Sequence, residues 1–259
     1  KRFEMNLKYN SEHDAWTGLY NRRSLEALLN KALHSSQNGK SALVGINLRA
    51  IQTLNMVYGF QYTWALVRKF SDMLNTFCDK DRQLFNLYDY YFAIYVRRYQ
   101  DREVLAEFCS IIAHRLRDQL TQERVNIGMG IVEMEPGVGL TVDHLMKSIL
   151  IATEKAMEKS DDLAICFFDR DMEAAIVRKD EIKRELAIVA ADPGNDQLYL
   201  QFQPIWNLHS GKVCSFEALA RFRSLQYGLV SPLAFIPIAE ETKLIIPLGY
   251  RIIEQSFRF

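Results

Sequence analysis

The sequence lacks the features that mark membrane, nucleic-acid-binding and secreted proteins. No apolar run in its 259 residues approaches the roughly 18 residues that a membrane helix needs, so we expect no membrane contact from it. Basic and acidic side chains number 32 each, so no net charge attracts nucleic acid, and we expect no nucleic-acid partner. Residues 1–14 lack the apolar centre of a signal peptide.

Cysteine is also scarce. The four cysteines lie far apart and form no CxxC pair, which indicates reduced thiols in a cytoplasmic protein. They are Cys78, Cys109, Cys166 and Cys214.

The polar, helix-like start at Lys1 is typical of a signalling helix that follows an upstream sensor domain. In a longer parent protein, such a domain would be the place for a membrane tether.

Material for a hydrophobic core is present. Hydrophobic residues make up 49% of the chain, which predicts one or two folded domains. Apolar residues at helical spacing predict helices, and β-branched or aromatic runs predict strands. The predicted helices are 22–34, a short piece ending at Gly59, a longer helix through Leu74, 104–116, 142–159, 171–191, and the segment from Pro232 onward. The predicted strands are 42–48, 83–88, 91–97, 125–132, 163–168, 198–205 and 213–222.

The order of these elements predicts two domains. Over residues 1–170 it matches a split βαβ sheet covered by helices, an α+β architecture. Residues 83–88 and 91–97 nearly abut, which predicts a hairpin that turns around residues 88–90. The helix breaker Asp192-Pro193-Gly194-Asn195 follows a long charged helix, and we place a second domain at residues 171–259.

One N-terminal segment resembles a known family. The residues His13-Asp14-Ala15-Trp16-Thr17-Gly18-Leu19-Tyr20-Asn21-Arg22-Arg23 are similar to the opening signature of GGDEF domains, the diguanylate cyclases that join two GTP into cyclic di-GMP. The similarity continues through Asn55, Gly59 and the hairpin to Phe168, about two thirds of the chain. It implies a nucleotidyl-cyclase-like sheet for residues 1–170.

The resemblance breaks down where the family's chemistry takes place. Phosphoryl transfer relies on metal ions held by carboxylates. The family's two acidic metal positions fall on Asn47 and Tyr91, and the Gly-Gly-Asp-Glu-Phe pentapeptide is replaced by Tyr88-Asp89-Tyr90-Tyr91-Phe92. Arg49 adds a positive charge where the family usually has another Asp, which opposes metal binding. We therefore expect no cyclase activity and no catalytic residue in this chain.

Nucleotide recognition is incomplete as well. Asn55 matches the base-reading Asn of the family, but the partner Asp corresponds to Trp64 and the family's Gly-His is Gly59-Phe60. The Arg-x-x-Asp of the inhibitory product site is absent, because that segment reads Asp-Lys-Asp-Arg at 79–82. We interpret the remaining positions as a vestigial nucleotide site made of Asn47, Asn55, Tyr88, Asp89, Tyr90 and Tyr91.

Ordinary structural roles compete with this interpretation. Asn47 would serve as a hydrogen-bonded residue at the end of a strand, and Asn55 as a helix or turn residue. The tyrosines around the hairpin would form a packing or partner surface rather than stack on a base.

Three motifs of the second domain stand in a second family's order. They are Gln203-Pro204-Ile205, then Glu217-Ala218-Leu219-Ala220-Arg221-Phe222, then Phe235-Ile236-Pro237-Ile238-Ala239-Glu240-Glu241 with Leu248-Gly249. They resemble the start of an EAL domain, the cyclic di-GMP phosphodiesterase, whose fold resembles a TIM barrel. The resemblance implies that Glu217 is a metal ligand.

By the same resemblance, Gln203, Leu219 and Arg221 are substrate-binding positions. A hard divalent cation prefers oxygen ligands, and a guanidinium suits a phosphodiester. An intact EAL domain would therefore use Mg²⁺ or Mn²⁺ and have cyclic di-GMP as its partner.

The second domain is short for this fold. A TIM barrel needs roughly 200 to 250 residues, so we expect a truncated EAL domain that lacks the later metal carboxylates, and no cofactor in this chain. Residues 197–259 are then expected to be covered by self-association, by strand exchange or by folding back on the first domain. Five apolar residues are expected to lack the strands that would bury them: Ile245, Ile246, Leu248, Ile252 and Ile253.

These observations predict a bacterial cyclic di-GMP signalling protein. An inactive GGDEF domain would act as a regulatory or dimerisation module for an EAL phosphodiesterase. Two alternatives stay open. One is a non-enzymatic interaction protein with both domains degenerate, and the other is a first domain that binds GTP without converting it and so senses nucleotide.

Overall fold

A computed structural model describes residues 9–35, 39–48, 51–120, 127–134, 140–158, 163–192 and 194–258. The chain divides into two compact units, Lys1–Met172 and Glu173–Phe259, and each is described by itself. Arg49, Pro193 and the start at Lys1, which entered the sequence analysis, lie outside the described residues. Within the described ranges no helix has the length and apolar content to cross a membrane.

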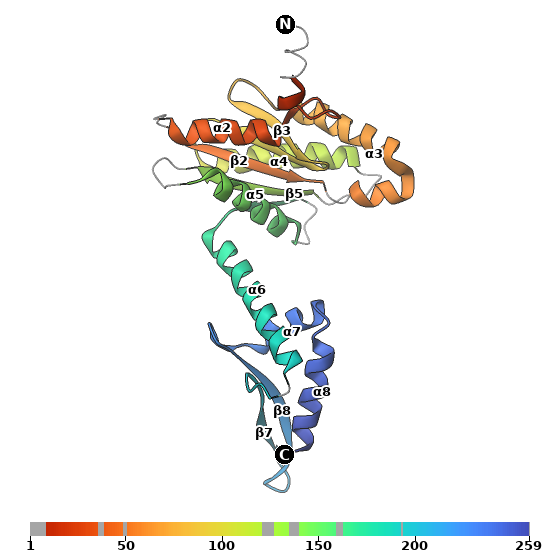
Figure 1. The fold of residues 1–259 in the computed structure, drawn as a ribbon, viewed down its shortest axis with the longest axis vertical. Helices are drawn as coiled ribbons and strands as arrows, with labels where there is room; N and C mark the ends of the chain where they lie inside the picture. Colours follow the sequence, from red (N-terminus) through yellow and green to blue (C-terminus); the bar gives the residue numbers. More distant parts are fainter. Residues whose placement is uncertain are drawn as a thin grey trace. The chain divides into compact units, whose positions relative to one another are not determined.

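The first unit is a six-stranded sheet flanked by helices (Figure 1). Its strands are β1 (Tyr20–Asn21), β2 (Ser41–Asn47), β3 (Arg82–Tyr88), β4 (Tyr91–Val96), β5 (Ile127–Met134) and β6 (Leu163–Phe167). Its helices are α2 (Arg22–His34), α3 (Ile51–Asn75), α4 (Arg102–Leu120) and α5 (Val142–Met157). The α+β class and the predicted hairpin are confirmed, whereas the two-residue strand β1 was not predicted.

The strand order is β1-β3-β4-β2-β5-β6. The pairs β1–β3 and β5–β6 are parallel, and the pairs β3–β4, β2–β4 and β2–β5 are antiparallel. The hairpin of β3 and β4 therefore inserts into the sheet beside β2. As a result, the start of β4 lies beside the end of β2, and Tyr91 pairs with Asn47.

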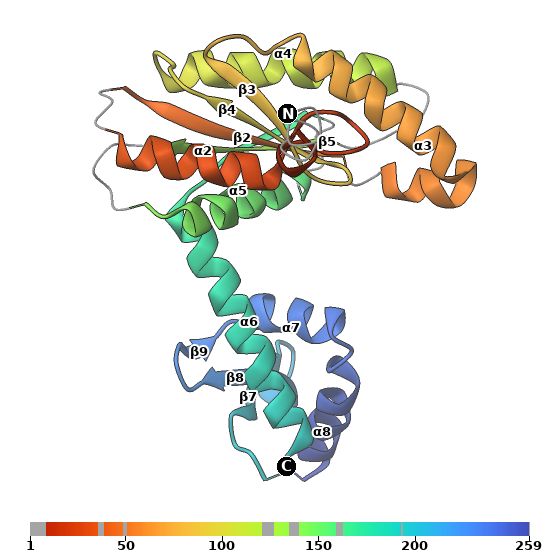
Figure 2. The same cartoon turned by 45° about the horizontal axis from the view of Figure 1, so that its top comes forward.

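Each face of this sheet has its own core, because successive strand residues point to opposite faces. Figure 2 shows the sheet between α3 and α4 on one side and α2 and α5 on the other. On the first face the core includes Val44, Ile46, Phe92, Phe70 and Ile112. On the second face it includes Leu43, Phe85, Leu25, Leu29 and Ile149.

The predicted break in α3 is confirmed at Gly59. This residue has φ 78° and ψ 168° between two helical pieces. A positive φ of this size favours glycine, because a Cβ would strain the backbone. The piece that precedes Gly59 carries Asn55.

The second unit is a three-stranded antiparallel sheet with helices on one face (Figure 1). Its strands are β7 (Leu198–Asn207), β8 (Lys212–Ser224) and β9 (Gly228–Val230). Its helices are α6 (Arg170–Ala191), which starts at the end of the first unit, α7 (Pro232–Glu241) and α8 (Ile245–Phe257). The core of this unit joins Leu198, Phe222 and Val230 of the sheet to Leu186, Phe235 and Leu248 of the helices.

The expectation for α8 was wrong for three of its five apolar residues. Ile245, Leu248 and Ile252 pack into the core of the second unit. They lie on one helix face at spacings of three and four residues, so the strands and helices present in this chain are enough to cover them. Ile246 and Ile253 lie off this face and remain 59% and 55% exposed.

A buried carboxylate joins α6 to the sheet of the second unit. Glu185 is 5% exposed and accepts three hydrogen bonds. The donors are Gln197 Nε2 at 2.7 Å, Ser224 Oγ at 2.7 Å and the backbone N–H of Leu225 at 2.9 Å. Because a buried charge is costly without such partners, these bonds fix the beginning of β7 and the end of β8 to the helix.

We predict that Glu185→Ala destabilises the second unit by about 2 to 4 kcal/mol, because Gln197, Ser224 and the Leu225 amide lose the buried acceptor that they share. The control is Glu181→Ala on the same helix, whose half-exposed carboxylate lies 3.8 Å from the Arg184 guanidinium. Hydrogen exchange at the Leu225 amide should accelerate strongly in Glu185→Ala and little in the control. Equal protection in both variants would contradict the assigned role of Glu185.

Candidate functional site

The two positions that would carry metal-binding carboxylates lie next to each other. Asn47, the last residue of β2, pairs directly with Tyr91, the first residue of β4. Both are buried, with 5% and 6% of their surfaces exposed. Asn47 Nδ2 donates to Glu154 Oε1 of α5 over 3.3 Å. The first side chain of the pair is thus bonded to α5.

Tyr91 reaches the same helix more deeply. Its Oη lies 2.6 Å from Thr153 Oγ1 and donates to the carbonyl of Ile149 over 3.1 Å. A Cβ at Gly45 would lie 2.8 Å from Tyr91 Oη, so glycine leaves the room that the phenol occupies. Burial raises the pKa of Tyr91 well above its ordinary value. The phenol therefore stays neutral and is a poor replacement for a carboxylate that holds Mg²⁺.

The other two tyrosines of the turn are also held by helices. The guanidinium of Arg22 on α2 lies over the Tyr88 ring, 5.4 Å from its centroid, and donates to the Tyr88 hydroxyl. Asn55 Nδ2 on α3 donates to the Tyr90 hydroxyl. We refer to Tyr88, Tyr90 and Tyr91 as the tyrosine turn. Its three side chains bind α2, α3 and α5, although Tyr88 stays 44% exposed, and Asp89 between Tyr88 and Tyr90 is exposed.

At the other positions that the resemblance singles out, Trp64 and Arg82 make aromatic contacts and Phe60 is exposed. Trp64, where the family has the second base-reading residue, stacks on Trp16 with centroids 4.7 Å apart and planes at 14°. Phe60 is 68% exposed. The guanidinium of Arg82, at the former product site, lies 4.4 Å from the centroid of Phe108 on α4.

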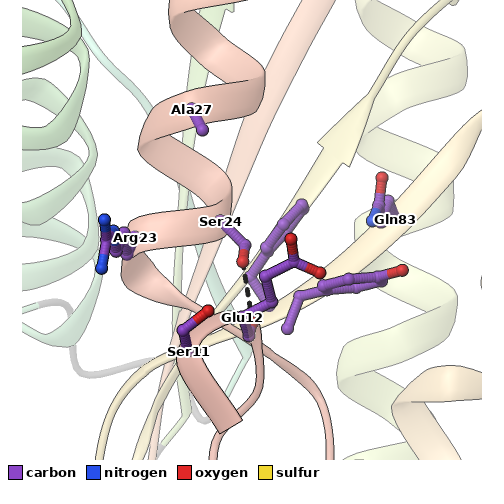
Figure 3. A pocket seen from close by; sticks show the side chains of 8 residues that line it. Ser11, Glu12, Arg23, Ser24, Ala27 and Gln83 are labelled. Atoms are coloured by element: carbon purple, nitrogen blue, oxygen red, sulfur yellow. Dashed lines mark hydrogen bonds between the residues drawn. The ribbon is translucent and has the colours of Figure 1, made fainter. Parts of the chain in front are cut away.

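A pocket of about 370 Å³ lies in the first unit, away from these positions (Figure 3). Figure 3 shows Ser24 donating to the backbone carbonyl of Glu12, a bond of 2.7 Å. The pocket is lined by Ser11, Glu12, Tyr20, Arg23, Ser24, Ala27, Gln83 and Phe85. None of these residues belongs to the predicted vestigial nucleotide site.

In the second unit the structure gathers the predicted EAL residues on one face of the β7–β8 hairpin. Gln203 of β7 pairs directly with Glu217 of β8. Leu219 and Arg221 follow Glu217 at two-residue intervals and therefore project from the same face. The opposite face carries Leu198 and Phe222 of the core. Gln203, Glu217, Leu219 and Arg221 thus form one surface of the sheet.

The described residues do not by themselves build a metal centre. No three His, Cys, Asp or Glu side chains in the described ranges lie close enough together to hold an ion. On the β7–β8 face Glu217 is an exposed carboxylate with Gln203 opposite it. A single carboxylate supplies one or two of the six ligands of an octahedral Mg²⁺ or Mn²⁺ ion.

Three residues of these sites were not predicted as site residues. Arg22 is part of the opening signature, but the sequence does not indicate its contact with Tyr88. Thr153 contacts Tyr91 from 62 residues away in the chain, and no local pattern signals such a contact. Gln201 precedes the Gln-Pro-Ile motif by two residues, and strand alternation places it on the same face.

Comparison with known proteins finds two families. The model of the family "Diguanylate cyclase, GGDEF domain" matches residues 11–162, and that of the EAL domain matches residues 187–259. An uncharacterized signaling protein of Caulobacter vibrioides is 29% identical over 98% of this chain and 32% of its own length. The cyclic di-GMP phosphodiesterase PdeR of Escherichia coli is 27% identical over 98% of this chain and 38% of its own length.

A solved structure has the same fold over almost the whole chain. It is the S helix-GGDEF-EAL portion of Vibrio cholerae LapD bound to c-di-GMP, with a TM-score of 0.66 and 20% identity over 99% of this chain and 61% of that one. This chain spans about a third of the length of the two curated relatives that it matches.

We predict that Tyr91→Glu destabilises the first unit by about 3 to 5 kcal/mol, because it removes a buried ring and places a carboxylate under α5. The matched control is Asp89→Ala in the exposed part of the same turn, which should change stability by no more than about 0.5 kcal/mol. Urea unfolding of the chain, followed by near-ultraviolet circular dichroism, measures both. A Tyr91→Glu protein as stable as the control would show that the position tolerates an acid.

Proposed function

The chain belongs to the GGDEF family and continues into an EAL domain, the tandem organisation of cyclic di-GMP signalling proteins, and we propose that its GGDEF domain is a regulatory module without cyclase activity. In this proposal the module serves an EAL domain that hydrolyses cyclic di-GMP. The whole protein's activity is inferred in part from relatives, one of which carries the name of a cyclic di-GMP phosphodiesterase.

One observation carries the proposal for the first domain. The tyrosine turn occupies the hairpin whose glycines and acidic residues the cyclase reaction needs, and its side chains are bonded to α2, α3 and α5. Without a carboxylate at Asn47 or Tyr91, no pair of metal ions can be held against the triphosphate. Tyr88 and Asp89 also place side chains where the family's glycines let a phosphate approach the backbone.

The tyrosine turn weighs against a GTP sensor as well. Asn55 would have to release Tyr90 before its amide reads a base, and the partner position holds Trp64 stacked on Trp16. The second alternative is a non-enzymatic interaction protein in which both domains are degenerate. For the second domain, one face of the β7–β8 hairpin favours a phosphodiesterase role. This face displays a carboxylate, an amide, an apolar side chain and a guanidinium together, from Glu217, Gln203, Leu219 and Arg221.

In the second domain we assign Glu217 as one metal ligand and Gln203, Leu219 and Arg221 as substrate contacts. Mg²⁺ or Mn²⁺ bound there would polarise the scissile phosphodiester. Because Glu217 is the acid on this face of the described sheet, the further ligands have to come from elsewhere in the intact barrel. The guanidinium of Arg221 would bind phosphate oxygens of cyclic di-GMP.

We predict that Glu217→Ala in the full-length gene product abolishes cyclic di-GMP hydrolysis and leaves the melting temperature within about 2 °C, because Glu217 is exposed on its strand. The control is Glu240→Ala, an exposed acid of α7 on the other side of the sheet, which should retain activity. Product release with Mg²⁺ or Mn²⁺ measures the effect. Hydrolysis by Glu217→Ala at the rate of the control would refute the assignment.

A further inference from the structure

Arg221 is held in a defined orientation by a neighbouring strand. Its Nε donates to Gln201 Oε1 of β7 over 2.7 Å, and its Nη1 donates to the backbone carbonyl of Ala220 over 3.0 Å. Gln201 pairs with Leu219, so it lies diagonally across from Arg221 on the same face of the hairpin. Within the described residues Nη2 has no hydrogen-bond partner, and it is the edge of the guanidinium left for a ligand.

The acceptor beside Arg221 is an uncharged side chain, in contrast to the carboxylates that pair with two other arginines of the second unit. Arg184 pairs with Asp180 over 2.7 Å, and Arg258 pairs with Glu254. Arg221 has no carboxylate partner among the described residues. An amide oxygen fixes the planar guanidinium through one hydrogen bond without neutralising its charge, so the full charge remains available to an anion.

We propose that Gln201 is a positioning residue that orients the Arg221 guanidinium toward a phosphodiester of the substrate. This inference rests on the proposed function, since it names how the phosphate contact of that site is built. Gln201 fixes the Nε edge, which leaves the Nη2 edge to bind phosphate oxygens. Fixing a long side chain before binding reduces the conformational entropy that binding would otherwise remove.

The identity of residue 201 therefore sets the affinity for the anion. A Glu at this position has the same shape and forms an ion pair with Arg221, which competes with the phosphodiester. A Met at this position has a similar length and offers no strong acceptor, so the guanidinium loses its orientation and keeps its charge. Neither change should alter the fold, because the side chain of Gln201 is exposed.

The test is calorimetric binding of cyclic di-GMP to the full-length protein without divalent metal, so that bound substrate is not hydrolysed. We expect Gln201→Glu to weaken binding about tenfold and Gln201→Met about threefold, with unchanged melting temperatures. The control is Gln226→Glu, which adds the same charge at an exposed loop position of the same unit and should bind as the wild type does.

A double-mutant cycle separates positioning from an independent effect. In an Arg221→Ala background, Gln201→Glu should cause no further loss, because the two residues act through one guanidinium. An equal loss in both backgrounds would overturn the inference. Wild-type affinity in Gln201→Glu, with binding weakened by Arg221→Ala, would overturn it and leave the proposed function standing. A wild-type protein that does not bind cyclic di-GMP would overturn both.

Discussion

The Tyr91 ring, buried between the sheet and α5, is the contact that the first unit depends on. It lies at the junction of β2 and β4, directly opposite Asn47, and its hydroxyl reaches Thr153 and the Ile149 carbonyl through the space that Gly45 leaves open. Burying such a ring contributes about 2 to 3 kcal/mol, and its hydrogen bonds about 1 kcal/mol more. A carboxylate at this depth would lose that packing and its hydration together. One position cannot be both a packed core residue and a metal ligand.

The same logic extends along the turn and accounts for the function proposed for each unit. Tyr88 accepts a hydrogen bond from Arg22 and Tyr90 accepts one from Asn55, so the turn of the hairpin is bonded to α2 and α3 at the positions where the family resemblance implies a nucleotide site. In the second unit the polar residues stay on an open face of the sheet, and the buried carboxylate, Glu185, serves the fold. This contrast between the two units is the basis of the proposal that the first unit regulates and the second carries the hydrolase residues.

The sequence was most informative where patterns are long or motifs are specific. The helical spacing of apolar residues in α2 and the β-branched and aromatic runs predicted the sheet and its hairpin. The family resemblance assigned Asn47 and Tyr91 to one site before the strand register was known. Strands β1 and β9, of two and three residues, are too short to show a period. The expectation for Ile245, Leu248 and Ile252 failed because it assumed that only absent strands would cover them.

Contacts between distant residues were outside the reach of sequence patterns. The hydrogen bond of Tyr91 with Thr153 depends on how closely α5 approaches the sheet. The need for glycine at position 45, where a Cβ would collide with Tyr91 and α5, follows from that approach and not from the sequence. The hydrogen bond from Arg221 to Gln201 likewise depends on strand register. The register of β7 and β8 places Gln203, Glu217, Leu219 and Arg221 on one face. Their roles in binding are predictions that binding and activity measurements test.

The most direct test of this account is incubation of the chain with GTP and Mg²⁺ or Mn²⁺, with calorimetric binding and product formation followed together. The account predicts no cyclic di-GMP and no binding heat at millimolar GTP. Tyr91 stands where a metal-binding acid is expected, and the Asn55 amide is bonded to Tyr90 instead of to a base. Formation of cyclic di-GMP, or binding of GTP at micromolar concentration, would contradict it.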